Sequence, residues 1–322
     1  MTRKINNSYT LGQSNAPTDG GDMLKTRADG TLVWEGVADT TFVPYSFQGS
    51  NSGFTTGNTT SNVIDKFDFS SNTTATDHGD LSITRRYVAG QSSSLYGFTT
   101  GGESSNVIDR FAFSSNVTAT DWGDLTTSRY GNAGQSSSDY GFTSSKDGSS
   151  ASVIDRFPFS TNSGATDWGD LSSIRRYVAG QSSTTEGFTS GGDGPSNVID
   201  KFSFASSGDA TDHGDLSVGR NTCAGQSSSD YGFTSGGYIS YRVNTIDRFA
   251  FSSNTTATDW GNITENKHSV AGQSSTTHGF TSGGEPSAVS NVIDKFSFAS
   301  SGDATDWGDL SVARDNGAGT QY

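Results

Sequence analysis

The stretch Gly97–Leu125, GFTTGGESSNVIDRFAFSSNVTATDWGDL, decides the fold, because near copies of it return throughout the chain. Its Ile-Asp-Lys/Arg-Phe segment occurs six times, at intervals of 44, 46, 45, 47 and 47 residues, beginning at Ile64, Ile108, Ile154, Ile199, Ile246 and Ile293. A fixed period in this range indicates one supersecondary unit per copy, which must stack on its neighbours to bury its apolar side. The sequence therefore predicts one array of six units.

Each copy has the pattern of four strands. In the second copy these are the segments 87–92 (YVAGQS), 96–100 (YGFTT), 107–113 (VIDRFAF) and 120–125 (TDWGDL). Glycine-rich turns separate them, and no window has the apolar period of a helix. Four-stranded sheets stacked around an axis leave few open edges. We therefore predict an all-β fold, a six-bladed β-propeller over residues 42–322, behind an extended N-terminal arm of residues 1–41.

The C-terminal segment is predicted to close the ring. Residues 318–321 match the Ala-Gly-Gln strand that opens the other copies, whereas Val43–Phe47 aligns with it badly. We therefore expect the C-terminus to supply the first strand of the first blade, with Val43–Phe47 as a linker or an additional strand.

Composition excludes several functional classes. The net charge is −14, from 34 acidic and 20 basic residues, and such a surface repels nucleic-acid phosphates. The single cysteine, Cys223, rules out a disulfide framework and is expected to be a buried thiol. The first residues contain no apolar signal-peptide segment, and no run reaches membrane-spanning length. We expect neither secretion through a signal peptide nor membrane insertion.

The N-terminal arm contains a hairpin signature. Asp29-Gly30 lies between two short strand-like segments, and this dipeptide favours a tight turn. The hairpin either folds back onto the propeller as a lid or anchors the chain to another protein. Because no hydrophobic block holds the first twenty residues, the anchor is favoured. Its candidate anchoring residues are Met23, Leu24, Leu32, Val33 and Trp34.

Two sets of aspartates recur in every copy. Asp121 of the Thr-Asp-Trp-Gly turn has the spacing of a residue that caps its own turn, and not that of a calcium loop. Asp109 and its equivalents are expected to pair with a basic residue of the following strand or of the next blade. Charges repeated in every blade are structural, so we expect no metal and no cofactor.

No catalytic constellation is present. Two of the four histidines, His78 and His213, replace tryptophan in the repeat, and the others, His268 and His278, form no cluster with them in the sequence. The serine runs lack a partnered histidine and aspartate. We therefore expect a protein without enzymatic activity.

The candidate surface-binding residues are Tyr238, Tyr241 and Arg242. They lie in the part of the repeat that differs most in the fifth and sixth copies. Three further tyrosines, Tyr96, Tyr140 and Tyr231, precede the second strand of their copies. Their rings either stack on sugars at the surface or are buried between blades.

Together these features resemble the kelch repeat. The resemblance rests on a glycine doublet after an aromatic strand, followed by tryptophan, leucine and a basic residue. The doublets are Gly101-Gly102, Gly191-Gly192, Gly236-Gly237 and Gly283-Gly284; the tryptophans are Trp122, Trp168, Trp260 and Trp307; the basic residues are Arg85, Arg129, Arg175, Arg220, Lys267 and Arg314. The first and third copies lack the doublet, which predicts different turns there.

The whole chain resembles structural proteins of tailed bacteriophages, those of marine cyanophages in particular. The resemblance rests on kelch-like repeats rich in Ser, Thr and Gly behind the segment 23–34 (MLKTRADGTLVW). It implies a virion protein whose arm docks on capsid, neck or tail proteins, and through which copies associate. The propeller would then serve as a decoration or as a host-binding module, with host surface glycan as a partner. Two alternatives remain: a soluble glycan-binding propeller, and a scaffold for protein interactions.

Overall fold

The computed structural model describes residues 22–26, 32–36, 48–146 and 151–322. The chain divides into two units, Met1–Pro44 and Tyr45–Tyr322. In the first unit, strands β1 (Asp22–Thr26) and β2 (Leu32–Gly36) pair antiparallel, with Leu24 opposite Trp34 and Thr26 opposite Leu32. This pairing agrees with the predicted hairpin; the turn itself lies outside the described residues.

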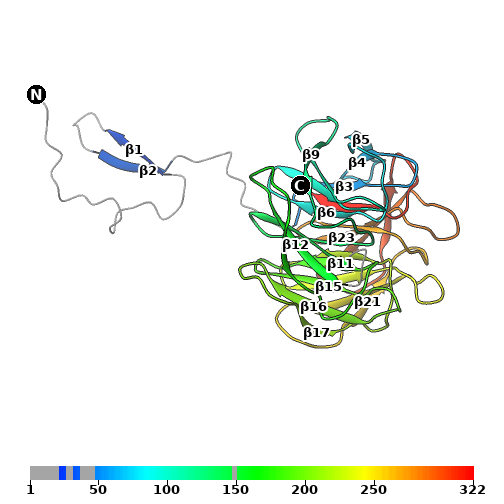
Figure 1. Ribbon diagram of the computed structural model, residues 1–322. Coiled ribbons are helices and arrows are strands. Elements are labelled where there is room, and N and C mark those ends of the chain that lie inside the picture. The colour runs from blue at the N-terminus through cyan, green and yellow to red at the C-terminus, as the bar shows by residue number, and fades with distance from the viewer. Residues whose placement is uncertain (1–21, 27–31, 37–47, 147–150) are drawn as a thin grey trace, which may run out of the picture. The chain divides into compact units, whose positions relative to one another are not determined.

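The second unit is a six-bladed β-propeller, as predicted. Its six sheets are all four-stranded and antiparallel, and Figure 1 shows them following one another in chain order from blue to red. The first strands of blades 1 to 6 contact one another in a closed ring and line the axis. They are β26 (Ala318–Gln321), β6 (Ala89–Ser92), β10 (Ala133–Ser136), β14 (Ala179–Ser182), β18 (Ala224–Ser227) and β22 (Ala271–Ser274).

The other three strands of each blade follow outward from the axis. The second strands are β3 (Ser52–Thr56), β7 (Tyr96–Thr100), β11 (Tyr140–Lys146), β15 (Glu186–Ser190), β19 (Tyr231–Ser235) and β23 (His278–Ser282). The third are β4 (Val63–Asp68), β8 (Val107–Ala112), β12 (Ser152–Pro158), β16 (Val198–Ser203), β20 (Thr245–Ala250) and β24 (Val292–Ser297). The fourth are β5 (Thr76–Asp80), β9 (Thr120–Asp124), β13 (Thr166–Gly169), β17 (Thr211–Asp215), β21 (Thr258–Asn262) and β25 (Thr305–Asp309).

The C-terminal strand closes the ring, as its Ala-Gly sequence predicts. β26 pairs antiparallel with β3, from Ala318 opposite Thr56 to Gln321 opposite Gly53. The competing segment, Val43–Phe47, lies outside the described residues. Blade 1 is therefore assembled from the two ends of this unit.

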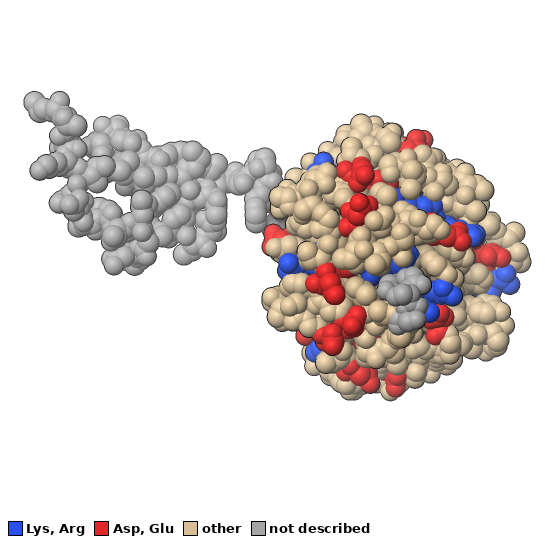
Figure 2. All heavy atoms as spheres, in the orientation of Figure 1, with Lys and Arg blue, Asp and Glu red and all other residues tan. Residues whose placement is uncertain are grey.

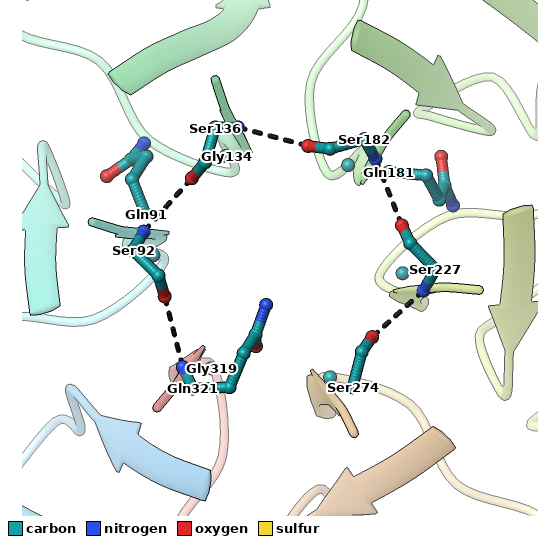
Figure 3. Close-up of a pocket in the computed structure, with 14 residues that line it drawn as sticks. Gln91, Ser92, Gly134, Ser136, Gln181, Ser182, Ser227, Ser274, Gly319 and Gln321 are labelled. Atoms are coloured by element: carbon teal, nitrogen blue, oxygen red, sulfur yellow. Dashed lines mark hydrogen bonds between the residues drawn. The ribbon is translucent and has the colours of Figure 1, made fainter. Parts of the chain in front are cut away.

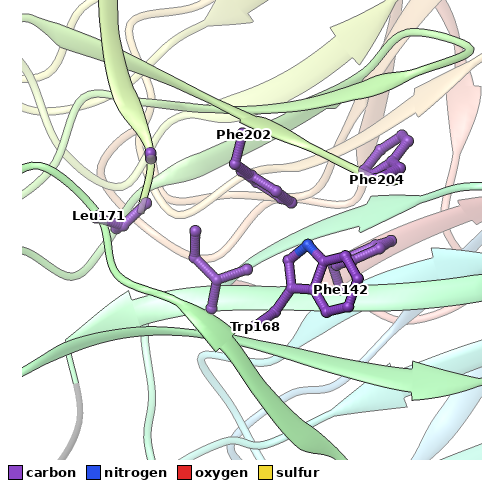
Figure 4. Packing of buried hydrophobic residues seen from close by; sticks show 7 residues of the cluster. Phe142, Trp168, Leu171, Phe202 and Phe204 are labelled. Carbon is purple, nitrogen blue, oxygen red and sulfur yellow. The ribbon is translucent and has the colours of Figure 1, made fainter. Parts of the chain in front are cut away.

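The apolar core lies between adjacent blades. Phe142 of blade 3 stacks on Phe204 of blade 4 with ring centroids 4.7 Å apart, and Trp168 and Leu171 pack beside them (Figure 4). Five equivalent clusters fill the other junctions. A blade without its neighbour would expose these rings, which explains how a chain with only 30% hydrophobic residues folds.

Backbone contacts close the ring at the axis. A Cβ atom on Gly134 would lie 2.1 Å from the carbonyl oxygen of Gly90 in the preceding blade, and the other axial glycines stand in the same relation. Two residues before each first strand, a backbone N–H donates to the carbonyl of the equivalent residue in the preceding blade, and these six hydrogen bonds form a closed cycle. Its members are Tyr87, Gly131, Tyr177, Thr222, Ser269 and Asn316, all with positive φ.

The left-handed conformation of Tyr87 also explains one boundary. The predicted first strand, 87–92, begins only at Ala89, because a residue with φ 58° interrupts the extended backbone. The predicted third strand, 107–113, ends at Ala112, since the backbone N–H of Phe113 donates to the Leu95 carbonyl instead.

The ends of the strands define two faces. The connection face carries the segments that join one blade to the next and the loops between second and third strands; Glu103 and Arg86 are hydrogen-bonded there. The turn face carries the turns between first and second strands and the loops between third and fourth strands. Gln48, the first described residue of this unit, lies at the axis on the turn face, where its Nε2 donates to the carbonyls of Ser227 and Ser275 (both 3.2 Å).

Candidate binding face

The predicted anchoring residues all lie in the hairpin. In its register, Leu24 pairs with Trp34 and Leu32 with Thr26, whereas Val33 pairs with Lys25 and Met23 with Glu35. The residues are thus brought together in one two-stranded element.

The predicted surface residues lie on the connection face, in the loop between β19 and β20. Arg242 reaches the loop of blade 6, where its Nε donates to the Glu285 carbonyl (2.9 Å) and its Nη2 lies 3.2 Å from the Glu285 carboxylate. The ring of Tyr238 meets His268 edge-on at 5.5 Å. The two longest loops between second and third strands are therefore joined into one raised edge.

Tyr241 is the most exposed side chain of this group, at 64%, compared with 37% for Tyr238. The structure thus brings Tyr238 and Arg242 into one network and leaves Tyr241 open to solvent. His268 and Glu285, the partners of this loop, were not predicted from the sequence. Burial lowers the pKa of His268, while Glu285 raises it and Arg242 lowers it further.

Most of the exposed large apolar side chains lie on the connection face. Of the nine large hydrophobic side chains that are exposed among the described residues, seven lie there: Ile83, Ile174, Val218, Tyr238, Tyr241, Val289 and Val312. The two on the turn face are Leu95 and Val117. On the side of the propeller shown in Figure 2, acidic and basic side chains are interspersed.

A second aromatic group on the connection face was not predicted. Tyr87, Tyr130 and Tyr177 form a triangle with ring centroids 5.4–5.9 Å apart. The guanidinium of Arg86 lies over Tyr87 (5.0 Å), and that of Arg176 lies over Tyr130 (4.8 Å) and Tyr177 (5.2 Å). We call these five residues the tyrosine–arginine cluster. Burial raises the pKa of Tyr87 and of Tyr177.

Tyr96, Tyr140 and Tyr231, which are the first residues of their second strands, have a structural role. Arg110 lies between the rings of Tyr96 (4.5 Å) and Trp122 (3.7 Å), and the same stack occurs in blades 3 and 5 around Tyr140 and Tyr231. The three tyrosines are partly buried against the interblade cores. Of the two interpretations, burial is the one that describes them.

The recurring aspartates are also structural, but their pairing differs from the prediction. Asp121 accepts a hydrogen bond from the backbone N–H of Gly123 (2.9 Å), which confirms that it caps its own turn, and all six copies do the same. Asp109, however, pairs with Arg85, which precedes it in the connection into the same blade (3.2 Å). The prediction of a basic residue from the following strand or the next blade was wrong.

The geometry explains this difference. Each connection passes over the blade that it enters, so its basic side chain contacts the aspartate of that blade. The backbone of the connection also donates a hydrogen bond to the same carboxylate, as the N–H of Ser82 does to Asp109 (3.0 Å). Both side chains of each pair are at most 1% exposed. The pairs are Arg85–Asp109, Arg129–Asp155, Arg175–Asp200, Arg220–Asp247, Lys267–Asp294 and Arg314–Asp65.

His78 and His213 replace tryptophan without loss of its hydrogen bond. The Trp122 indole N–H donates to a carbonyl of the next blade, that of Pro158 (3.1 Å). His78 Nε2 lies 2.9 Å from the equivalent carbonyl of Ala112, and His213 Nε2 lies 2.9 Å from that of Ala250. This confirms that these histidines serve as repeat residues.

The axial cavity on the turn face is small and polar. Its mouth is lined by a ring of serines, and the backbone N–H of Ser92 donates to the hydroxyl of Ser136 (3.0 Å), as each serine does to the next around to Ser274 (Figure 3). Gln321 replaces serine in blade 1 and points toward the centre of the ring, whereas Gln91 and Gln181 point away. The opposite mouth is lined by Val88, Asn132, Val178, Cys223, Val270 and Gly317 with the strands that follow them.

Among the residues that the structure describes, neither a metal centre nor a reactive thiol emerges. Within the described ranges, no three His, Cys, Asp or Glu side chains are grouped to hold a metal ion. Cys223 is buried, as predicted, and burial raises its pKa to about 11. None of the described residues belongs to a helix long and apolar enough to cross a bilayer.

No protein-family model matches the chain, and a search of curated proteins found no match to it.

Proposed function

We propose that this protein is a non-enzymatic virion structural protein of a tailed phage, docked through its N-terminal arm and displaying the propeller as a decoration or host-binding module. One observation carries the proposal. Gln48 lies at the axis of the turn face, whereas the two longest loops between second and third strands, one of which carries Tyr241, lie on the connection face. A chain held by its arm would keep the connection face available for a partner.

The sequence supports the virion assignment through resemblance. Kelch-like repeats behind a hairpin at residues 22–36 are similar to phage structural proteins, and β1 and β2 form such a hairpin. Proteins of the capsid, neck or tail are the proposed docking partners, and the virion is the proposed location.

The structural use of the repeated polar residues supports a non-enzymatic role. The aspartates cap turns or pair with buried bases, and two histidines hold blades together. The repeated aspartates and these two histidines, which are residue types common in catalytic sites, therefore already make structural contacts.

A soluble binding propeller is the second candidate. The exposed ring of Tyr241 and the larger number of exposed apolar side chains on the connection face favour it, because aromatic residues are enriched at interfaces. Such a propeller would either bind glycans or serve as a scaffold for protein interactions, and neither function requires the N-terminal arm.

The test compares full-length protein with a version lacking residues 1–41 for retention on purified phage particles. The deletion removes neither Gln48 nor β26, so the ring closure is kept in both. A third version, carrying Leu24→Asp and Trp34→Asp, changes the hairpin alone. Retention of only the unaltered chain supports the proposal, and equal behaviour of all three contradicts it.

A further inference from the structure

We propose that the tyrosine–arginine cluster, Tyr87, Tyr130, Tyr177, Arg86 and Arg176, is a single binding site for a neutral carbohydrate. The inference deepens the proposed host-binding role and rests on it only for the source of the ligand. The site is distinct from the raised edge formed by Tyr238, Tyr241 and Arg242.

The cluster is a departure from the sixfold repeat. At the position of Tyr87 and Tyr177, the remaining blades carry Gly131, Thr222, Ser269 and Asn316. Because Gly131 has no side chain, the rings of Tyr87 and Tyr177 converge over it to 5.4 Å; a Cβ there would lie 2.8 Å from Tyr177 Cδ1. The grouping therefore occurs once in the ring, so one ligand site per propeller is expected.

The charge of the cluster selects against anionic ligands. Arg86 Nε lies 2.7 Å from the Glu103 carboxylate, and Arg176 Nε lies 3.2 Å from that of Asp193. Each guanidinium is thus neutralised by its own acid in a protein whose net charge is −14. A phosphate, sulfate or sialic acid would meet no uncompensated positive charge, and the field of the whole chain would oppose its approach.

The same ion pairs suit a sugar. All four charged side chains are accessible, with 33% of Arg86, 52% of Glu103, 33% of Arg176 and 34% of Asp193 exposed. Each pair places a fixed donor beside a strong acceptor, and sugar hydroxyl groups act as both. The three partly buried tyrosines, whose ring planes are inclined to one another by 48–67°, provide the aromatic surface against which the C–H groups of a pyranose ring pack.

The test is an array of neutral, sialylated and sulfated oligosaccharides probed with the full-length protein, followed by calorimetry with a neutral oligosaccharide that binds. Tyr177→Thr and Tyr87→Asn introduce residues that this chain already carries at the equivalent positions, so both variants keep the backbone conformation. Glu103→Gln removes one acceptor at the surface. Its matched control is Glu186→Gln, which breaks another partly exposed ion pair, Lys201–Glu186 (3.3 Å), outside the cluster.

The proposal expects binding of neutral glycans at one site per chain, with affinity lowered at least tenfold by Tyr177→Thr, Tyr87→Asn and Glu103→Gln and unchanged by Glu186→Gln. Equal affinity in all variants, binding confined to charged glycans, or no glycan binding overturns it. Loss on Tyr241→Ala alone would place the ligand at the raised edge and overturn it as well. None of these results depends on whether the arm holds the chain on a particle, so the two proposals fail separately.

Discussion

Arg314 and Asp65 form the ion pair that joins the C-terminal connection to the first blade, with Arg314 Nη2 2.6 Å from the Asp65 carboxylate. Arg314 Nη1 also donates to the carbonyls of Val63 (2.7 Å) and Thr55 (3.2 Å). Burial raises the pKa of Asp65, and the charge of Arg314 opposes this effect. The two ends of the propeller are thus held by buried charge as well as by strand pairing.

Replacing Arg314 by methionine is expected to destabilise the propeller by about 3–5 kcal/mol, because Asp65 remains buried without its counter-charge. Denaturant unfolding measures the change. As a control, Lys201→Met breaks a pair whose side chains are 31% and 32% exposed, and should cost about 0–1 kcal/mol. An equal loss of stability in both variants would show that the buried pair contributes no more than the exposed pair.

Replacing Thr320 by glutamine is expected to stabilise the protein by about 1–2 kcal/mol. In blade 2, Gln91 Nε2 bridges to the next blade through the Phe142 carbonyl (2.9 Å) and the Thr143 hydroxyl (2.9 Å). Thr320 occupies that position in blade 1, and its buried hydroxyl has no hydrogen-bond partner. Glutamine would restore the bridge between blades 1 and 2.

The reverse change supplies the comparison for Thr320→Gln. Gln91→Thr should lower the midpoint of thermal unfolding by an amount similar to the rise caused by Thr320→Gln. A fall in both variants would mean that blade 1 has no room for the amide.

Replacing Lys267 by arginine is expected to add about 1 kcal/mol of stability. Lys267 makes its ion pair with Asp294 at 2.8 Å. In blade 5, Arg220 contacts Asp247 (3.2 Å) and also donates to the Thr234 carbonyl (2.8 Å). Arg220→Lys should lower the free energy of unfolding by about as much as Lys267→Arg raises it. Urea unfolding of the two variants side by side measures both changes.

Replacing His78 by tryptophan is expected to reduce acid sensitivity. Burial lowers the pKa of His78 below the ordinary value of 6.5, and nearby Lys66 lowers it further. As the pH falls below 6.5, His78 is protonated in the unfolded state before it is protonated in the folded state. The stabilising contribution of neutral His78 is therefore complete above pH 6.5 and is lost as the pH falls toward the pKa of the folded state. The free energy of unfolding of His78→Trp should therefore fall less between pH 7 and pH 5.

Blade 6 shows that tryptophan is accommodated next to a lysine at this position. Lys295 Nζ lies 3.4 Å from the ring centroid of Trp307, whose indole N–H donates to the Asp68 carbonyl (3.0 Å). An unchanged pH dependence in His78→Trp would assign the acid sensitivity to other groups, of which His268 and His278 also have lowered pKa values.

The repeated part of the fold could be predicted because each copy repeats the same local chemistry. Phe98, Asp121 and Trp122 mark fixed positions in strands and turns, and Ala318-Gly319 identifies the closing strand by its match to the other copies. Asp109 was assigned the wrong partner, because sequence order does not show over which blade a connection passes.

The tyrosine–arginine cluster could not be predicted from sequence alignment. Tyr130 stands at the repeat position of Arg86, one residue before that of Tyr87, so the three rings do not share an aligned column. Only the close approach of neighbouring connections around the axis, with Gly131 between them, brings these rings together.

The axial glycines also limit how the gene can change. Gly134 touches the Gly90 carbonyl so closely that no other residue fits, and this contact recurs around the whole circle. Recombination between near-identical repeats would produce chains with five or seven units. In such a chain the distance between every pair of neighbouring axial glycines would change at once. We therefore expect only chains with six repeats to keep these contacts.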